Sequence, residues 1–346
     1  MKVTTQKRTY WPTKEWRTAD PASLGLQPAK LTQLERAITS QYRNINGLLI
    51  VKEGQIAYEK YFNKTRPGDT HHVASVTKSV TSALIGMAID AGNIASVEQK
   101  VLDFFPEIEV QPTDTQKRAL TIRHLLTMTA PFAWKGYEPL DRLRRQKDWT
   151  AYIFKALSRN GRFGKFQYST ASTHLLSVIL TRATGMCAQL YANEQLFRPL
   201  GMREIPDHEM TSFTLEDMFG ESIAGWPKDP DGNTTGGWGL RLTPRDMARF
   251  GFLYLNRGLW DDQQIISESW VTASTARQAE HYGYLWWLRE ANGLSTYAAL
   301  GAGGNVICCI PAKDLVVVIA AKVIRKPRDP WQLLEHYILP AIHNEA

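Results

Sequence analysis

The spacing of hydrophobic positions changes along the chain and divides it into three parts. Leu31, Leu34 and Ile38 are spaced as on one face of a helix and predict a first helix. Two apolar runs at 47–51 and 56–62, joined by Lys52-Glu-Gly-Gln55, then predict a β-hairpin. Near the end, four β-type runs predict strands at 284–288, 297–300, 306–310 and 315–320, and a final helix is predicted over about 330–343.

Helical spacing dominates the middle of the chain, with clear segments at 121–126, 152–157, 173–180 and 195–197. Strands at both ends with helices between them predict an α+β fold, in which a mostly antiparallel sheet is built from both chain ends and flanked by helices. An all-helical lobe is inserted into it. The expected domains are a sheet domain at 20–95 plus 236–346, a helical lobe at 96–235, and an N-terminal leader at 1–19. A cleft between the two larger parts is a natural place for a site.

Composition and charge narrow the possible partners. The 346 residues are 43% hydrophobic and 22% charged, with a formal charge of +7. Lysine and arginine are scattered, and the densest cluster, Arg142, Arg144, Arg145 and Lys147, is flanked by acidic residues as on a solvated helix face. No nucleic-acid partner is therefore expected. A small-molecule substrate is expected, and the oligomeric state is left open.

The three cysteines do not suggest a disulfide framework or a metal site. Cys308 and Cys309 are adjacent on a predicted strand, so they should point to opposite faces as buried thiols. No metal and no cofactor are expected. Residues 1–8 lack the apolar stretch of a secretory signal, and no apolar run approaches ~20 residues, so no membrane partner is expected. The expected location is the cytoplasm, or the periplasm or exterior had a signal been removed.

A hydroxyl and an amine lie three positions apart in Ser75-Val-Thr-Lys78, at the start of an apolar helix that ends near Gly92. Residues three apart share a helix face, so the amine of Lys78 can reach the hydroxyl of Ser75. A serine becomes a strong nucleophile when a neighbour accepts its proton. The motif is short, and an N-cap serine followed by a surface lysine would give the same letters.

Two further segments could complete such a site. Tyr168 follows a glycine-bearing loop and precedes a helix, and a phenol near an ammonium can act as a general base. A packed tyrosine with a hydrogen-bonded tip is the structural alternative. Gly301-Ala-Gly-Gly304 ends a predicted strand and permits close approach of backbone N–H groups to a substrate, or it is simply a hairpin turn.

In this order, Ser75-Val-Thr-Lys78, Tyr168-Ser-Thr170 and Leu300-Gly-Ala-Gly-Gly304 resemble the serine β-lactamase-like family, which holds class C β-lactamases, D-Ala-D-Ala peptidases, family VIII carboxylesterases and 6-aminohexanoate-dimer hydrolases. The resemblance implies that Ser75 is acylated, that Lys78 accepts its proton and that Tyr168 relays protons to the leaving group. It implies an oxyanion hole from the N–H groups of Ser75 and Ala302. The other substrate-binding positions that it implies are Gly301, Gly303, Gly237 and Trp238.

The chain departs from the family where a carboxylate would be bound. The usual Lys-Thr-Gly is replaced by Ala299-Leu-Gly301, and Thr170 stands where asparagine is usual. The expected function is therefore a serine hydrolase of carboxylic esters or small amides. A β-lactamase or D-Ala-D-Ala peptidase is the alternative, with a penicillin-binding-like sensor or scaffold as the non-enzyme alternative. Whether Lys78 or Tyr168 is the base for acylation stays open, as does Arg241 as a replacement cation.

Overall fold

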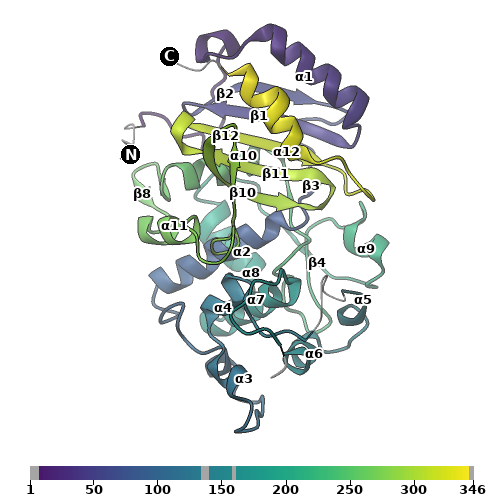
Figure 1. Cartoon of the computed structure of the whole chain (residues 1–346), viewed down its shortest axis with the longest axis vertical. Coiled ribbons are helices and arrows are strands. Elements are labelled where there is room, and N and C mark those ends of the chain that lie inside the picture. The colour runs from purple at the N-terminus through teal and green to yellow at the C-terminus, as the bar shows by residue number, and fades with distance from the viewer. Residues whose placement is uncertain (1–7, 134–139, 158–160, 343–346) are drawn as a thin grey trace.

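The computed structural model describes residues 8–133, 140–157 and 161–342 (Figure 1). Most of the predicted leader, at 1–7, and the last residue of the predicted final helix, His343, lie outside the described residues. So do parts of the predicted helical lobe, at 134–139 and 158–160.

The sheet has six antiparallel strands in the order β2-β1-β12-β11-β10-β9, and this confirms the predicted fold class. The chain ends meet in its centre, where Leu49 of β1 lies opposite Val318 of β12. Alternating side chains bury both faces, and Cys308 and Cys309 lie on opposite sides of β11 as predicted. The strands are β1 (Ile45–Lys52), β2 (Gln55–Tyr61), β9 (Trp287–Ala291), β10 (Leu294–Gly301), β11 (Asn305–Ile310) and β12 (Leu315–Ala321).

One strand prediction was wrong in its position. The apolar run 284–288 was predicted as a strand, but β9 begins only at Trp287. Residues 284–286 form a buried loop in which Leu285 has a positive φ of 62° and its carbonyl accepts from the hydroxyl of Ser79. The apolar run is explained by burial of this loop against the helices beneath the sheet, where Trp286 is fully buried.

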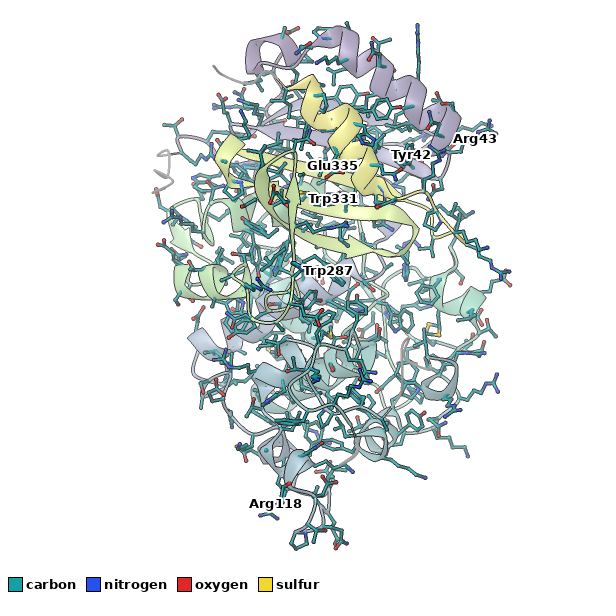
Figure 2. The ribbon with its side chains drawn as sticks, viewed as in Figure 1. Tyr42, Arg43, Arg118, Trp287, Trp331 and Glu335 are labelled. Atoms are coloured by element: carbon teal, nitrogen blue, oxygen red, sulfur yellow. The ribbon has the colours of Figure 1, made fainter. Side chains whose placement is uncertain are left out.

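Helices cover both faces of the sheet (Figure 1). On one face lie α1 (Pro28–Gln41) and the C-terminal segment, which begins as α12 (Pro330–Leu333) and continues as π and 3₁₀ turns to Ala341. Figure 2 shows Trp331 of this segment over the sheet. On the other face lie α2 (Val76–Asp90) and α10 (Pro244–Leu255), a helix not predicted from the spacing.

Most of the remaining helices extend the molecule away from the sheet, below α2 in Figure 1, whereas α9 (Leu215–Phe219) and α11 (Glu268–Ser274) lie at about the height of α2. The remaining helices include the four predicted helical segments, as α4, α6, α7 and the π turn Asn193–Phe197. Two-residue strands occur in the segments between helices. Of these, β3 (His71–His72) pairs with β6 (Arg241–Leu242), and β3 precedes α2 in the chain. The helices are α3 (Thr115–Ala119), α4 (Ile122–Leu126), α5 (Leu140–Leu143), α6 (Trp149–Ala156), α7 (Thr170–Thr184), α8 (Ala188–Ala192), α9 (Leu215–Phe219) and α11 (Glu268–Ser274), and the other short strands are β4 (Asp207–His208), β5 (Trp226–Pro227), β7 (Leu259–Trp260) and β8 (Gln263–Gln264).

Within the described ranges no single helix is long and apolar enough to cross a membrane. One bent pair, Thr170–Thr184 with Ala188–Phe197, passes the same test on length and composition at an angle of 77°.

Candidate active site

Ser75 lies at the N-terminal end of α2, directly after the short strand β3, which follows the edge strand β2 in the chain. The N–H of Val73 donates to the carbonyl of Leu240, which fixes this approach. Ala74 then takes a left-handed conformation with φ of 49°, and Ser75 is the half-buried residue that precedes the first helical position. A non-glycine residue at positive φ is strained, and such strain is held only where the surroundings over-determine the backbone.

Lys78 is buried, with 1% of its surface exposed, and this excludes the alternative of a surface lysine. Its amine lies 3.1 Å from Oγ of Ser75, 3.2 Å from Oγ1 of Thr170 and 2.7 Å from the carbonyl oxygen of Gly237. Three oxygens from three segments therefore hold the amine in one position. The amine is placed to exchange a proton with the serine hydroxyl directly.

Tyr168 approaches the same amine from the start of α7. Ser169 caps that helix by accepting from the N–H of Ser172, so Tyr168 and Thr170 are fixed on either side of the cap. The ring centre of Tyr168 lies 5.0 Å from the amine of Lys78, within cation–π range. Its ring stacks on Trp287 at 5.5 Å, and Figure 2 shows Trp287 at the level where the sheet meets the helices.

Gly237 and Trp238 belong to an irregular segment that lies between α2 and α7. Side chains of both helices donate to its carbonyls: Thr81 to Gly236, Lys78 to Gly237 and Ser177 to Thr234. A Cβ added at Gly237 would lie 2.6 Å from Oγ1 of Thr173 and 3.2 Å from the amine of Lys78, so only glycine fits beside the lysine.

The far end of this segment is anchored by a buried pair. The ring of His174 on α7 donates from Nε2 to Oδ2 of Asp229 at 2.8 Å, and both side chains are almost fully buried. Burial alone would raise the pKa of Asp229, but the hydrogen bonds from His174 and Asn233 outweigh it and hold that pKa below its usual value.

The turn after β10 lies directly beside the serine. A Cβ added at Gly301 would lie 3.3 Å from the backbone nitrogen of Ser75, so the turn flanks that N–H group. Ala302 is exposed at the tip, and Gly303 is buried with φ of 83°. The side chain of Asn305 fixes this shape, because its Nδ2 donates to the carbonyl of Ala302 at 2.8 Å.

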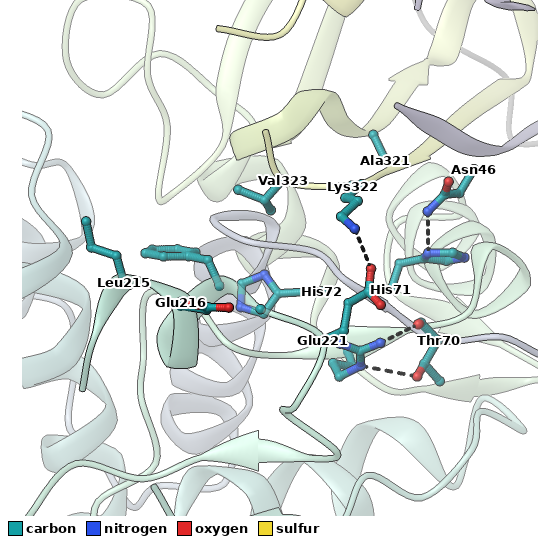
Figure 3. A pocket seen from close by; sticks show the side chains of 13 residues that line it. Asn46, Thr70, His71, His72, Leu215, Glu216, Glu221, Ala321, Lys322 and Val323 are labelled. Carbon is teal, nitrogen blue, oxygen red and sulfur yellow. Dashed lines mark hydrogen bonds and ion pairs between the residues drawn. The ribbon is translucent and has the colours of Figure 1, made fainter. Parts of the chain in front are cut away.

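Two cavities are lined by residues that neighbour the site in sequence, although neither is lined by Ser75 or Lys78. One, of about 430 Å³, includes Phe166, whose ring packs against Tyr282 and Trp287 on the Tyr168 side. The other, of about 720 Å³, is lined by both histidines of β3, by Arg241 and by residues 321–323 (Figure 3). Arg241 is half-buried and donates to Thr70, so it is not the surface arginine that the sequence allowed.

The structure brings Ser75, Tyr168 and Gly237 around the amine of Lys78 and places Gly301 beside the N–H of Ser75, although it does not test their roles. Ala302 and Gly303 follow in the same turn, whereas Trp238 is buried and stacks on the ring of His72. Sequence reasoning missed Asn305 as the support of the turn and Thr170 as a partner of the lysine. Thr170 had appeared only as a departure from a family pattern. The adjacency of Asn305 to the Gly301–Gly304 stretch was the available signal for the first.

Comparisons with known proteins bear on the family and the fold. The family model for beta-lactamase matches residues 31–329. The chain is 24% identical over 299 residues to the 6-aminohexanoate-dimer hydrolase of Paenarthrobacter ureafaciens, covering 79% of this chain and 71% of that protein. Two solved structures share its fold. They are the octameric penicillin-binding protein homologue from Pyrococcus abyssi (TM-score 0.68, 20% identity, 90% of this chain and 78% of that chain covered) and a penicillin-binding protein homologue from Caulobacter crescentus (TM-score 0.69, 17% identity, 94% and 99% covered).

Proposed function

This chain belongs to the beta-lactamase family, and from that premise we propose that it is a serine hydrolase that forms an acyl-enzyme on Ser75 and cleaves carboxylic esters or small amides. The observation that carries the proposal is the buried amine of Lys78, which lies 3.1 Å from Oγ of Ser75. A buried amine is costly unless it is hydrogen-bonded, and here one of its partners is the hydroxyl of a half-buried serine at the end of the same helix.

In the proposed acylation, Oγ of Ser75 attacks the carbonyl carbon and its proton passes to the amine of Lys78. The charge that develops on the carbonyl oxygen is stabilised by the N–H groups of Ser75 and Ala302. The bond to the leaving group breaks as that group takes up a proton relayed through Tyr168. In deacylation a water molecule loses a proton to the same groups, attacks the acyl-enzyme and returns Ser75 to its free hydroxyl.

The residue that faces the site from β10 supports esters or small amides as substrates. Ala299 and Gly301 lie on the α2 side of the strand, and Ala299 is 1% exposed. This buried methyl group offers neither the cation nor the hydroxyl that Lys-Thr-Gly supplies for a drug carboxylate. The amine of Lys78 meets a hydroxyl of Thr170 in place of an amide.

Three variants test the mechanism. Ser75→Ala should abolish labelling by a fluorophosphonate and turnover of p-nitrophenyl acetate. Lys78→Ala and Tyr168→Phe should each lower kcat by at least about a hundredfold, the lower end of general acid–base contributions. The matched control is Ser40→Ala, because Ser40 is an exposed serine on α1 and its loss should leave both labelling and turnover unchanged.

The outcomes separate the alternatives. Equal turnover of every ester and amide by wild type and Ser75→Ala would refute a hydrolase at this serine. Efficient turnover of nitrocefin would favour a β-lactamase, and turnover of a peptide ending in D-Ala-D-Ala would favour a peptidase. Stoichiometric labelling of Ser75 without turnover of any substrate would instead identify a sensor or scaffold.

A further inference from the structure

The 720 Å³ cavity lined by both histidines of β3 contains one charged group that is partly shielded from water. Four charged side chains line it, and Glu216, Glu221 and Lys322 are exposed whereas Arg241 is half-buried. Figure 3 shows Lys322 reaching to Glu221, and their 2.8 Å ion pair is solvent-exposed at both ends. Exposed charges are screened by water and salt, so the half-buried guanidinium is the least screened charge in the cavity wall.

Arg241 has no carboxylate partner within the part of the chain that the structure describes. Its Nε donates to Oγ1 of Thr70 at 3.3 Å, and its Nη2 donates to the carbonyl of Thr70 at 2.8 Å. Both are neutral acceptors, so the positive charge is oriented but not neutralised. Burial lowers the pKa of Arg241, since the charge has lost part of its hydration, and the negative charge of Glu221 only partly offsets this.

The neighbouring histidine, His71, also lines the cavity. Nδ1 of His71 accepts from the amide of Asn46 at 3.3 Å, which leaves the proton of a neutral ring on Nε2. This Nε2 is buried, and no described residue accepts from it; the whole side chain is only 8% exposed. Burial, followed by the charge of Arg241, lowers the pKa of His71 to about 4, so the ring is a neutral donor at pH 7.

The cavity shares its walls with the two segments that flank the nucleophile. His72 lies three residues before Ser75, which places this wall within about 11 Å of the serine along the chain. Lys322 and Val323 on the opposite wall back onto Gly303 of the turn, where an added Cβ would meet their backbone at 2.6–2.8 Å. Neither Tyr168 nor Trp287 lines the cavity, so it lies away from the proposed proton relay to the leaving group.

We propose that this cavity is a subsite for the acyl part of the substrate, and that Arg241, with His71 beside it, binds a carboxylate at the far end of that acyl chain. The substrate class is thus an ester or amide of a dicarboxylic acid. This inference rests on the proposed function of Ser75. It assigns a role to Arg241, which the sequence left open as a replacement for the missing cation.

A matched pair of substrates tests the subsite. p-Nitrophenyl hexanoate and mono-p-nitrophenyl adipate have acyl chains of the same length and differ by the terminal carboxylate, and their uncatalysed rates are subtracted. Wild type should show the higher kcat/KM for adipate. Arg241→Gln should lower kcat/KM for adipate by about ten- to a hundredfold, the loss of a charge-assisted contact, and change that for hexanoate by less than about threefold.

Two further variants complete the design. Arg36→Gln removes the same charge from an exposed position on α1 and should leave both substrates unaffected. Arg241→Lys keeps the charge without the planar fork and should retain part of the preference for adipate. If Arg241→Gln does not fold, the decision rests on Arg241→Lys and on the wild-type preference.

Equal loss on both substrates, or a wild-type enzyme that prefers hexanoate, would overturn the subsite while leaving the hydrolase intact. Retention of hexanoate turnover by Ser75→Ala would instead refute the proposed function itself.

Discussion

Replacing Asn305 should displace the turn that carries the N–H of Ala302 in the candidate oxyanion hole, although Asn305 is not proposed to contact the substrate. The side chain is fully buried, and its Nδ2 donates to the carbonyls of Ala302 at 2.8 Å and Ala321 at 3.1 Å. Its Oδ1 accepts from the N–H of Ala321 at 2.9 Å. The one side chain therefore joins the turn after β10 to the end of β12.

The cost of Asn305→Ala follows from these contacts. Three hydrogen bonds contribute about 1 kcal/mol each, and an unsatisfied buried N–H adds roughly 1–3 kcal/mol, so we expect a loss of about 4–6 kcal/mol in unfolding free energy. Asn305→Asp should be similarly harmful, because a second carboxyl oxygen would face two carbonyls. Removal of an oxyanion-hole donor lowers kcat by about 10²–10³. Displacement of the Ala302 N–H in Asn305→Ala should therefore lower kcat by a substantial part of that factor.

Urea unfolding and steady-state turnover of p-nitrophenyl acetate, measured on the same preparations, test this. The control is Thr296→Val, because Thr296 is also buried on β10 but bonds the carbonyl of Arg289 at the opposite end of the strand. It should lose about 1 kcal/mol of stability and keep its kcat. If Asn305→Ala lost several kcal/mol yet kept the wild-type kcat, the turn would not depend on this side chain and the reasoning would be refuted.

Three other changes have expected outcomes. Thr170→Val removes one hydrogen-bond acceptor of the Lys78 amine and should lower kcat roughly tenfold, the equivalent of one hydrogen bond. An unchanged kcat would show that this hydrogen bond does not contribute to catalysis. Ala74→Gly should raise the melting temperature or leave it unchanged, whereas Ala74→Val should lower it, since a β-branched residue tolerates φ of 49° poorly; equal melting temperatures would contradict the strain. Burial, followed by the charge of Arg241, lowers the pKa of both His71 and His72 to about 4. Between pH 4 and about 6.5 the unfolded chain therefore binds more protons than the folded chain, so stability should fall as the pH falls through that window. The loss should be at most about 3 kcal/mol for each ring. Urea midpoints should show a shallower slope for His71→Gln, and an identical slope would exclude that ring as a source.

The sequence was sufficient for the fold and for most of the site because those parts depend on local spacing. Ser75 and Lys78 are one helical turn apart, and the strands near the C-terminus carry continuous β-branched runs. The loop at 284–286 was misassigned because an apolar run does not reveal whether it is buried in a strand or in a turn. The burial of Arg241 and the links made by Asn305 arise from contacts between segments distant in sequence, and no local pattern encodes them.

The pairing of Leu49 with Val318 in the centre of the sheet has a consequence for how the protein is made. β1 lies near the N-terminus, but its partner β12 is available only when nearly the whole chain has been synthesised. Such non-local pairing slows folding. Until β12 is available, β1 and β2 present an unpaired edge, and the turn at 301–304 that flanks Ser75 has not emerged from the ribosome. The nucleophile is translated early, but its surroundings are completed among the last steps, so a chain that stops before β12 should have neither a closed sheet nor activity.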